Sequence, residues 1–383
     1  MTRGIPGAAL AAALALFGCG GGDGGDGADV VDSAVADVAG EVLETVAPPI
    51  KKQWKEIEVA RIEGITKVRG FGCNATQVVA DVEGAVSKGL YVWQSDGITG
   101  FENVYDGIGL IAVLDSQVLV AQYGGPNSTA SLVSVDAAGQ ATDLGFAFEN
   151  LEIRNLLTRE GTIYTLSKDW STAEYLVHTG AIGGGGFAAI GPRLIETGMG
   201  FLVAGEKVLL LANAAGALGT VCYENDANGT ADSPWNPCPA FPDYVAEKDG
   251  QPYSVVAEIY GKDDRMALWF RVSEKGVKKW VHYVADAQTK WTVVEGFPAV
   301  EPTAWLHDGE TIVLGYSAAG DKAPVYAASA DADTTAEPLA FGLPATSDKT
   351  GVVGFCRADD WLYAAWFEYN AGGSTLSLWR IKD

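Results

Sequence analysis

The sequence offers few side chains of the kinds that carry out catalysis, and they follow no recognisable spacing. Three histidines, His178, His282 and His307, occur in 383 residues, which leaves little material for a metal site built from imidazoles. No Ser-His-Asp or Cys-His arrangement stands out, and the glycine run at 183–186 lacks the Lys-Ser/Thr pair of a phosphate-binding loop. His307 and Glu258 lie on or beside expected strands, where we expect satisfied polar groups of a wet channel. The sequence therefore names no catalytic residue.

Residues 223–237 form a polar stretch whose oxygen-bearing side chains suggest one metal. Asp226, Asn228 and Asp232 surround a glycine, and such oxygen ligands are those that calcium prefers. The spacing is not that of an EF-hand, and no glutamate closes the loop. We expect an ordinary polar surface loop and no cofactor, with Ca²⁺ as the alternative.

A second pattern bears on glycan chemistry. Asp286–Trp291 resembles the Asp-box turn of sialidases and related propellers, without the leading serine and the central glycine. That turn is structural, so it supports a fold and not an activity. A sialidase-like site needs several arginines converging on one face with Tyr and Glu. Arg69, Arg154, Arg159 and Arg193 are present, but the sequence does not place them together.

The elements that must position any site are predicted by a repeat. A turn followed by an apolar, β-rich run recurs roughly every 40 to 60 residues, a spacing typical of propeller blades. Residues 308–331 are one such unit. Each run has an apolar strand before it and another strand after it, and a fourth strand precedes the next unit. The abundant glycines and aromatics, 48 Gly with 11 Trp, 14 Tyr and 13 Phe, also favour strands and turns. The runs begin near Val78, Val118, Ile163, Val208, Met266, Ile312 and Leu362.

Residues 54–383 are similar to the general class of seven-bladed β-propellers, an all-β fold of four-stranded antiparallel blades. The last unit lacks its fourth strand, because the chain stops at Asp383. Trp54–Ala60 alternates like a strand and has no unit of its own. Since an open sheet edge invites aggregation, we expect this strand to complete the last blade and close the ring. A pair of β-sandwiches is the alternative.

The ring also predicts how the cysteines pair. Cys73 and Cys356 end the first strands of the first and last blades, which are equivalent positions on neighbouring blades of a closed ring. We therefore expect a disulfide between them and a second one between Cys222 and Cys238. An exported chain favours disulfides over metal thiolates, and the sequence has no Cys-x-x-Cys.

The first residues read as an export signal. Arg3 is the only charge, and Ala8–Phe17 is an apolar run too short to span a bilayer permanently. The run ends in Leu16-Phe17-Gly18-Cys19, which resembles the bacterial lipobox. The resemblance implies a signal peptide over residues 1–18, cleavage before Cys19, diacylation of its thiol and N-acylation in many bacteria, for example with palmitate. Three acyl chains would anchor the protein stably in a membrane.

Residues 19–53 are predicted to be a disordered tether, because they are acidic, rich in Gly, Asp and Val, and poor in aromatics. Gly20, with no Asp at that position, is similar to lipoproteins sent to the outer membrane. We therefore expect a lipid-anchored protein of the bacterial cell envelope, on the periplasmic or surface face of the outer membrane. The net charge of −23 repels phosphate backbones and argues against nucleic acid as a partner.

Recognition is the function that these features favour. In propellers, the loops after the second strand and before the first form the binding rim, and here they carry Tyr123, Asn127, Trp170 and Tyr369. Exposed Tyr and Trp among small polar residues suit a protein or glycan partner. We predict a non-catalytic scaffold or recognition module. The alternative is a sialidase-like propeller hydrolase or lyase that acts on envelope or extracellular polysaccharide.

Overall fold

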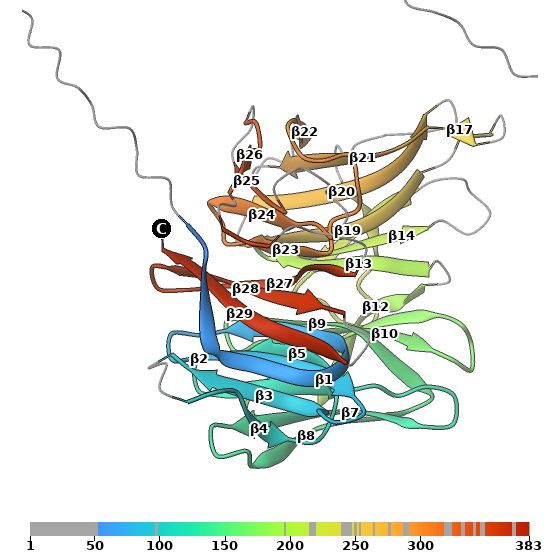
Figure 1. Ribbon diagram of the computed structural model, residues 1–383. Coiled ribbons are helices and arrows are strands. Elements are labelled where there is room, and N and C mark those ends of the chain that lie inside the picture. Colours follow the sequence, from blue (N-terminus) through green and yellow to red (C-terminus); the bar gives the residue numbers. More distant parts are fainter. Residues whose placement is uncertain are drawn as a thin grey trace, which may run out of the picture. The chain divides into compact units, whose positions relative to one another are not determined.

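The chain folds almost wholly into β-strands over the residues that the computed structural model describes (Figure 1). These residues belong to one compact unit, Lys51–Asp383, and none of them forms a helix able to cross a membrane. Cys19, most of the predicted tether and residues 286–290 of the turn that resembles an Asp-box lie outside them. The described residues are 53–95, 99–194, 197–213, 220–238, 247–248, 251–252, 254–262, 265–274, 277–285, 291–317, 324–330, 334–339, 342–344, 349–369 and 373–382.

Most of the strands form four-stranded antiparallel sheets made from consecutive segments, as the repeat predicts. A short hairpin, β17 (Glu247–Lys248) and β18 (Gln251–Pro252), stands apart. The four-stranded sheets of the described residues are β5 (Gly109–Val113), β6 (Gln117–Gln122), β7 (Thr129–Asp136) and β8 (Ala141–Glu149); β9 (Leu151–Arg159), β10 (Thr162–Asp169), β11 (Tyr175–Ala181) and β12 (Phe187–Leu194); β13 (Thr197–Ala204), β14 (Lys207–Asn213), β15 (Thr220–Asp226) and β16 (Asn236–Pro237); β19 (Ser254–Lys262), β20 (Arg265–Glu274), β21 (Val277–Ala285) and β22 (Trp291–Val294); and β23 (Ala304–His307), β24 (Thr311–Gly315), β25 (Val325–Ser329) and β26 (Glu337–Pro338).

One larger sheet joins the two ends of the domain. Its order is β27-β28-β29-β1-β2-β3-β4, and the strand in the middle, β1, has 19 residues. The first half of β1 pairs with β29, and its second half pairs with β2. The sheet therefore contains two four-stranded units that share one strand. Its strands are β1 (Lys55–Cys73), β2 (Gln77–Gly84), β3 (Gly89–Gln94), β4 (Glu102–Tyr105), β27 (Thr350–Ala358), β28 (Trp361–Glu368) and β29 (Ser374–Lys382).

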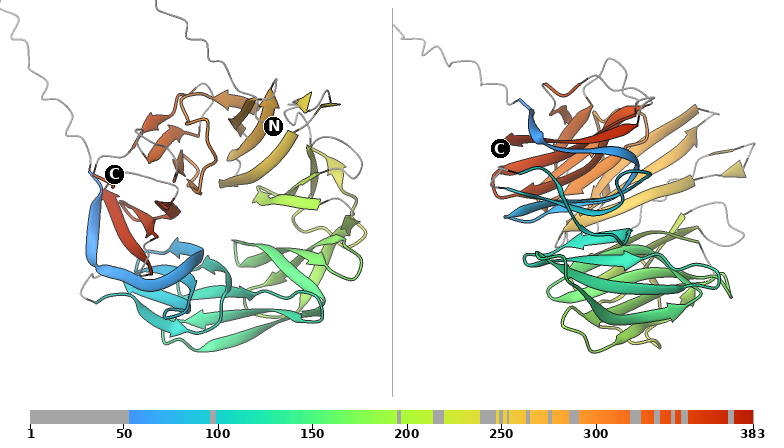
Figure 2. Two further views of the ribbon diagram at one scale, coloured as in Figure 1. Left: turned by 45° about the vertical axis from the view of Figure 1, so that its right-hand side comes forward. Right: turned by 60° about the horizontal axis from the view of Figure 1, so that its bottom comes forward.

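The four-stranded units follow one another around a circle in chain order (Figure 2). The first strand of each unit contacts the first strand of the next, from β1 through β5, β9, β13, β19 and β23 to β27, and β27 contacts β1. Gly354 of β27 shows how close this approach is, because a Cβ there would lie 2.5 Å from the Cβ of Phe71 in β1. Only glycine fits such a position.

The core lies between neighbouring sheets, and β6 shows how the sequence builds it. Val118 and Val120 of β6 pack with Val79 and Leu90 of the preceding sheet. The alternating residues Leu119 and Ala121 point to the opposite face, where they pack against the next sheet. Both faces of the strand are therefore buried, which explains why the second strand of each unit reads as an unbroken apolar run.

Two predicted strands differ from the observed ones. Trp54–Ala60 and the first strand of the first unit are not separate, because both belong to the single strand β1. The fourth strand of the unit that begins with β13 is the two-residue β16, which pairs with Tyr223 and Glu224. The sequence pattern predicts this fourth strand at residues 242–246, which lie outside the described residues. A two-residue strand leaves no periodic pattern in the sequence, so the pattern could not locate it.

Both predicted disulfides are present. Cys73 at the end of β1 is bonded to Cys356 of β27, which links the first strands of the first and last units across 283 residues of sequence. Cys222 of β15 is bonded to Cys238, directly after β16, and the Cys238 N–H donates to the Cys222 carbonyl at 2.9 Å. The second disulfide therefore holds the two-residue β16 against its neighbour.

The two disulfides are expected to differ in their contribution to stability. In the chain-entropy model, the bond that closes the longer loop contributes about 5 kcal/mol to the free energy of unfolding, and the shorter one about 3 kcal/mol. Chemical denaturation of a Cys73→Ala/Cys356→Ala variant and of a matched Cys222→Ala/Cys238→Ala variant measures both. Equal losses would contradict a contribution that grows with the length of the closed loop.

Candidate functional site

β-Bulges in the first strands bring two arginines to equivalent places. In β1, Val68 lies opposite Val82 and Gly70 opposite Asp81, so Arg69 is the extra residue of a bulge. In β9, two residues also lie opposite one residue of β10, which makes Arg154 the extra residue. The strands β13, β19 and β27 each have a register shift in their pairing with the second strand of their unit. A bulge bends its strand and redirects the side chain of the extra residue. These arginines therefore depart from the regular alternation of side chains between the two faces of the sheet.

Arg69 contacts residues from two sheets. Its Nη2 forms an ion pair with the Glu83 carboxylate at the end of β2. The same guanidinium lies over the ring of Tyr123, 5.2 Å from the centroid. Burial raises the pKa of Tyr123, while the hydrogen bond with Arg69 lowers it, and the net pKa lies above its usual value. Tyr123 is therefore a neutral phenol at neutral pH that is held by a cation.

Glu152 at the start of β9 organises the adjoining part of the site. Its Oε2 atom pairs with Arg154 Nη2 at 2.9 Å and accepts a hydrogen bond from Trp170 Nε1 at 2.9 Å. Lys168 places its Nζ 4.0 Å from the centroid of the Trp170 ring, within the range of a cation–π contact. The negative charge of Glu152 also raises the pKa of Tyr123, which connects this group to the contacts of Arg69.

We call this group the rim cluster: Arg69, Glu83, Tyr123, Glu152, Arg154, Lys168 and Trp170. It draws on three neighbouring four-stranded units, at the ends of their second strands and the starts of their first strands. Tyr123 and Trp170 were predicted from the sequence to lie on a binding rim, and the structure brings them into one network. The sequence did not place Glu83 and Glu152 in the site, although Glu152-Ile153-Arg154 puts two opposite charges around one apolar residue at a strand start.

The other two predicted rim residues take different places. The Asn127 N–H donates to the Asn150 side chain at 2.9 Å, and the Asn150 carbonyl accepts from the Trp170 N–H at 2.9 Å. Asn127 therefore belongs to a turn that supports the loop of Trp170. Tyr369 follows β28, is 54% exposed, and lines a separate cavity between the last two units.

A buried carboxyl lies beneath the rim cluster. Asp81 of β2 is fully buried, and its Oδ2 accepts a hydrogen bond from the Gly109 N–H at 2.8 Å. Among the described residues, neither its Oδ1 nor the buried Nε of Arg69 has a hydrogen-bond partner. Burial raises the pKa of Asp81 to about 7, although the Gly109 N–H and Arg69 act to lower it. No ligand can reach this carboxyl while the sheets are closed over it.

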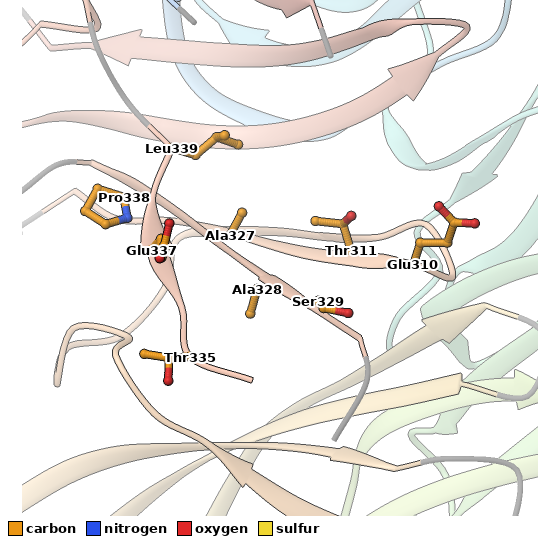
Figure 3. Close-up of a pocket in the computed structure, with 9 residues that line it drawn as sticks. All are labelled: Glu310, Thr311, Ala327, Ala328, Ser329, Thr335, Glu337, Pro338 and Leu339. Atoms are coloured by element: carbon orange, nitrogen blue, oxygen red, sulfur yellow. The ribbon is translucent and has the colours of Figure 1, made fainter. Parts of the chain in front are cut away.

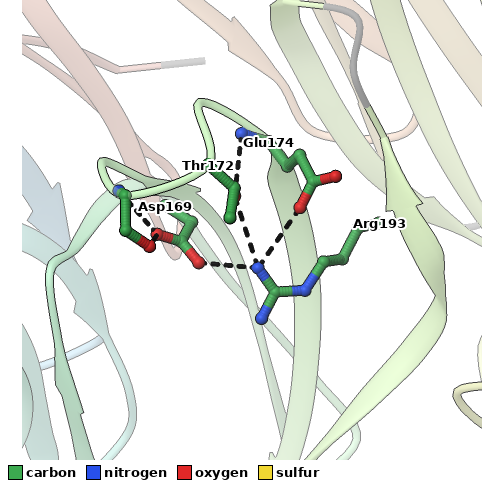
Figure 4. Close-up of polar contacts among 5 residues, drawn as sticks. Asp169, Thr172, Glu174 and Arg193 are labelled. Carbon is green, nitrogen blue, oxygen red and sulfur yellow. Dashed lines mark hydrogen bonds and ion pairs between the residues drawn. The ribbon is translucent and has the colours of Figure 1, made fainter.

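Arg193 is held in a neighbouring ion cluster (Figure 4). Its Nη1 lies 2.6 Å from Asp169 Oδ2 and 3.3 Å from Glu174 Oε2, so it joins the end of β10 to the start of β11. Burial would raise the pKa of Asp169, but hydrogen bonds from Ser171 and Arg193 outweigh it and lower the pKa to about 2. These contacts fix the loop that carries Trp170.

The arginines do not converge as a sialidase-like site requires. Arg69 and Arg154 belong to the rim cluster, and Arg193 is held by carboxylates of its own loop. Arg159 lies at the far end of β9 and donates to the Gly205 carbonyl. Because β9 runs from one face to the other, Arg154 and Arg159 near its two ends cannot serve one site.

The histidines with described side chains have structural surroundings. His178 is buried, and its ring stacks on Phe148 with centroids 4.9 Å apart. Burial lowers the pKa of His178 to about 4, so it is neutral at neutral pH. His307 is also buried, and its Nδ1 accepts the Gly309 N–H at 3.0 Å in the turn before β24. His307 therefore does not line a wet channel, where we had expected it. The side chains of His282 and Glu258 lie outside the described residues.

The calcium alternative gains no support from the loop after β15. Asp226 forms an ion pair with Lys207 at 2.7 Å, while Asn228 and Asp232 are exposed. Asn225, which was not a predicted ligand, bonds to the Ser233 carbonyl across the loop. Within the described part of the chain, no three His, Cys, Asp or Glu residues come together as a possible metal site.

A cavity beside the described strands differs from the rim cluster in the residues that line it. It has a volume of about 680 Å³ and is lined by strands β24 to β26. Figure 3 shows its two carboxylates, Glu310 and Glu337, at opposite ends, with alanines between them. Its described lining contains no cation to pair with them. The rim cluster, with its arginines and aromatics, is the stronger candidate for a functional site.

The buried Asp81 predicts a specific dependence of stability on pH. Its pKa of about 7 in the folded chain lies above the usual value of 3.8 for an aspartate, so the folded state holds the proton more tightly and loses stability as the pH rises between these values. Asp81→Asn removes this loss. The free energy of unfolding of Asp81→Asn should nearly equal that of the parent chain near pH 4. It should exceed that of the parent chain by about 4 kcal/mol above pH 7.

Urea denaturation across this pH range measures the difference. Asp360→Asn, on an exposed turn, is the matched control and should show no such trend. A constant difference between Asp81→Asn and the parent chain at every pH would show that folding does not raise the pKa of Asp81.

Comparison with known proteins identifies the fold. No known protein family matches the sequence, and no curated protein matches it. An oligogalacturonate lyase in complex with manganese is similar in structure with a TM-score of 0.57 at 9% identity, covering 87% of this chain and 98% of that one. A prolyl endopeptidase gives 0.53 at 15%, covering 84% and 48%. The β-propeller domain of the Trilobed protease from Pyrococcus furiosus gives 0.50 at 10%, covering 83% and 94%. At such identities these likenesses show the fold alone: the chain contains a β-propeller domain.

Proposed function

We propose that the domain is a non-catalytic recognition module that binds a protein partner through the rim cluster. The observation that carries this proposal is the composition of the cluster: Tyr123, Trp170, Arg69 and Arg154 meet on one edge of three sheets. Tyr, Trp and Arg are the residues enriched among the few that dominate protein–protein binding energy. Trp170 is 40% exposed, so it is available to a partner.

The protonation states of the cluster argue for recognition over catalysis. Tyr123 has a raised pKa, whereas a phenol acting as a base would need a lowered one. The glutamates are engaged by arginines. Asp81 has a pKa of about 7, which suits proton transfer at neutral pH, but it is fully buried.

A glycan lyase or hydrolase is the alternative function. The observation that favours it is the contact of Arg69 with Tyr123, since an arginine beside a phenol suits an acidic sugar. One structurally similar protein is an oligogalacturonate lyase in complex with manganese. Turnover of a polygalacturonate or sialylated substrate by the purified chain, lost on Tyr123→Phe, would establish this alternative.

We also infer that the domain is a ring of seven blades closed by its N-terminal strand. Two observations support this: β1 pairs with both β29 and β2, and contacts between first strands run from β1 to β27 and back to β1. A closed ring without free inner edges gives a rigid platform for loops on its rim.

The location of the protein in the cell is a separate proposal. We infer that Cys19 carries lipid and that residues 19–53 tether the domain to the bacterial outer membrane. The support is the lead sequence, with its short apolar run and Leu16-Phe17-Gly18-Cys19.

A Cys19→Ala variant tests the anchor. In the source bacterium, the parent chain should sediment with membranes and enter the detergent phase, while the variant should stay in the aqueous phase, because the acyl chains supply the membrane affinity. Detergent-phase partitioning of both chains would overturn the lipid proposal.

Substitutions in the rim cluster are expected to weaken the binding of a partner. Trp170→Ala removes an exposed aromatic anchor and should cost about 2 kcal/mol, or roughly thirtyfold in affinity. Affinity capture from detergent-solubilised envelopes compares the parent chain, Trp170→Ala, Tyr123→Ala and the control Val293→Ala, an exposed residue of the outer strand β22. A partner retained equally by all four chains would contradict the assignment of this surface.

A further inference from the structure

His178 lies buried at the contact between two neighbouring four-stranded units. It belongs to β11, and its ring is stacked on Phe148 with the centroids 4.9 Å apart and meets Phe146 edge-on at 5.5 Å. Both phenylalanines belong to β8, the outer strand of the preceding unit. The acidic residues of β8, Asp143 and Glu149, are exposed. The imidazole is therefore part of the packing that holds β8 against β11, and β8 contacts it with aromatic rings.

Two hydroxyl groups lie on the same face of the sheet as His178. Thr165 of β10 is directly opposite His178, and Ser167 follows two residues later on β10. Side chains of a strand alternate between its faces, and Ile163, on the face of Thr165 and Ser167, packs with the preceding unit. Both hydroxyls are fully buried, and within the described residues neither they nor the Nδ1 atom of His178 have a hydrogen-bond partner. Buried polar groups without partners make this contact weaker than a wholly apolar one.

The charges beside His178 oppose its protonation. Burial lowers its pKa to about 4, and the positive charge of Arg193 on β12 acts in the same direction. The carboxylates that face this region from β10 and β11 are those of Asp169 and Glu174. Both are engaged by Arg193, at 2.6 Å and 3.3 Å from its Nη1. They therefore hold a cation near the imidazole.

The sign of the pH effect follows from these surroundings. The buried imidazole binds its proton more weakly than an exposed one, whose usual pKa is 6.5. Any opening that exposes His178 to water is therefore favoured progressively as the pH falls from 6.5 towards 4, and this contribution to the stability of the contact is fully present above pH 6.5.

The same contact supports the loop that carries Trp170. The Trp170 N–H donates to the carbonyl of Asn150, the residue that directly follows β8, at 2.9 Å. On the other side, Asp169 directly precedes Trp170 and is paired with Arg193. Separation of β8 from β11 would therefore withdraw a support of the loop, and a protonated His178 would repel the arginine that supplies the other.

We propose that His178 forms an acid-sensitive contact between β8 and β11, whose opening on protonation frees the loop that carries Trp170. This device goes beyond the binding of a partner, and it is measured on the chain alone. Its failure would leave the proposed recognition surface standing.

The first test follows the imidazole and the opening in the full-length chain. NMR titration of the His178 ring, whose signal is identified by its loss in His178→Asn, should give a pKa well below 6.5. Hydrogen exchange, corrected for the intrinsic effect of pH on amides, should show about thirtyfold more opening at pH 5 than at pH 7.5 for β8, β11 and the Trp170 loop, since the exposed imidazole regains its usual pKa. His178→Asn should abolish this rise, and the amides of β2 should not share it.

The second test changes the neighbouring charge. Arg193→Gln should raise the pKa of His178 and reduce the rise in opening about threefold, because a cation beside the imidazole is removed. Arg61→Gln is the matched control: it breaks an ion pair with Glu56 and removes an arginine whose side chain is 48% exposed, against 47% for Arg193. Its rise should equal that of the parent chain.

Four results would overturn the proposal. These are a pKa of His178 at or above 6.5 in the folded chain, an equal rise in His178→Asn, an unchanged rise in Arg193→Gln, and a rise that the amides of β2 share. The NMR titration of the parent chain and the comparison of Arg193→Gln with Arg61→Gln decide the matter even where His178→Asn does not fold.

Discussion

The structure depends on one strand that is shared by two four-stranded units of a single sheet. β1 is long enough to pair with β29 along its first half and with β2 along its second half, and so it joins the first segment of the domain to the last. A sheet edge that is left open exposes unpaired N–H and C=O groups to other chains. Here the fourth position of the last unit is filled by residues from the other end of the domain. The disulfide from Cys73 to Cys356 fastens the same junction covalently.

This junction also determines where the rim cluster and the cavity beside Tyr369 lie. β1 carries Arg69 in a bulge within its second half, directly above the buried Asp81 of β2. On the other side, β27 contacts β1 and carries its own bulge residue, Val353. One kind of backbone irregularity, placed in first strands that touch each other, therefore supplies a cation to the rim cluster and an apolar wall to the cavity. Which chemistry appears at each place is decided by a single side chain.

The sequence predicted the repeated four-stranded units and the cysteine pairs, since both depend on local patterns that survive in the fold. Apolar runs such as that of β6 are buried on both faces, and their length and spacing are visible without coordinates. Strands without such a pattern were missed: β16 has two residues and is held by pairing and a disulfide. The convergence of Arg69 with Tyr123 was also out of reach, because a bulge is set by packing between sheets. The carboxylates of Asp81 and Glu83, which interrupt the apolar run of β2, were a sign of a site there.

The contacts within the rim cluster bear directly on what it can do. Trp170 is fixed by Glu152 and Lys168, and its loop is held by Asn150 and by the Arg193 ion cluster. Side chains that are already ordered lose little conformational entropy when a partner binds. The same engagement limits chemistry, since the carboxylates of Glu83 and Glu152 are paired with arginines and the phenol of Tyr123 has a raised pKa. Rigid aromatic and cationic side chains of this kind suit the proposed recognition role, and the raised pKa of Asp81 reduces the negative charge that lies beside Glu83 at neutral pH.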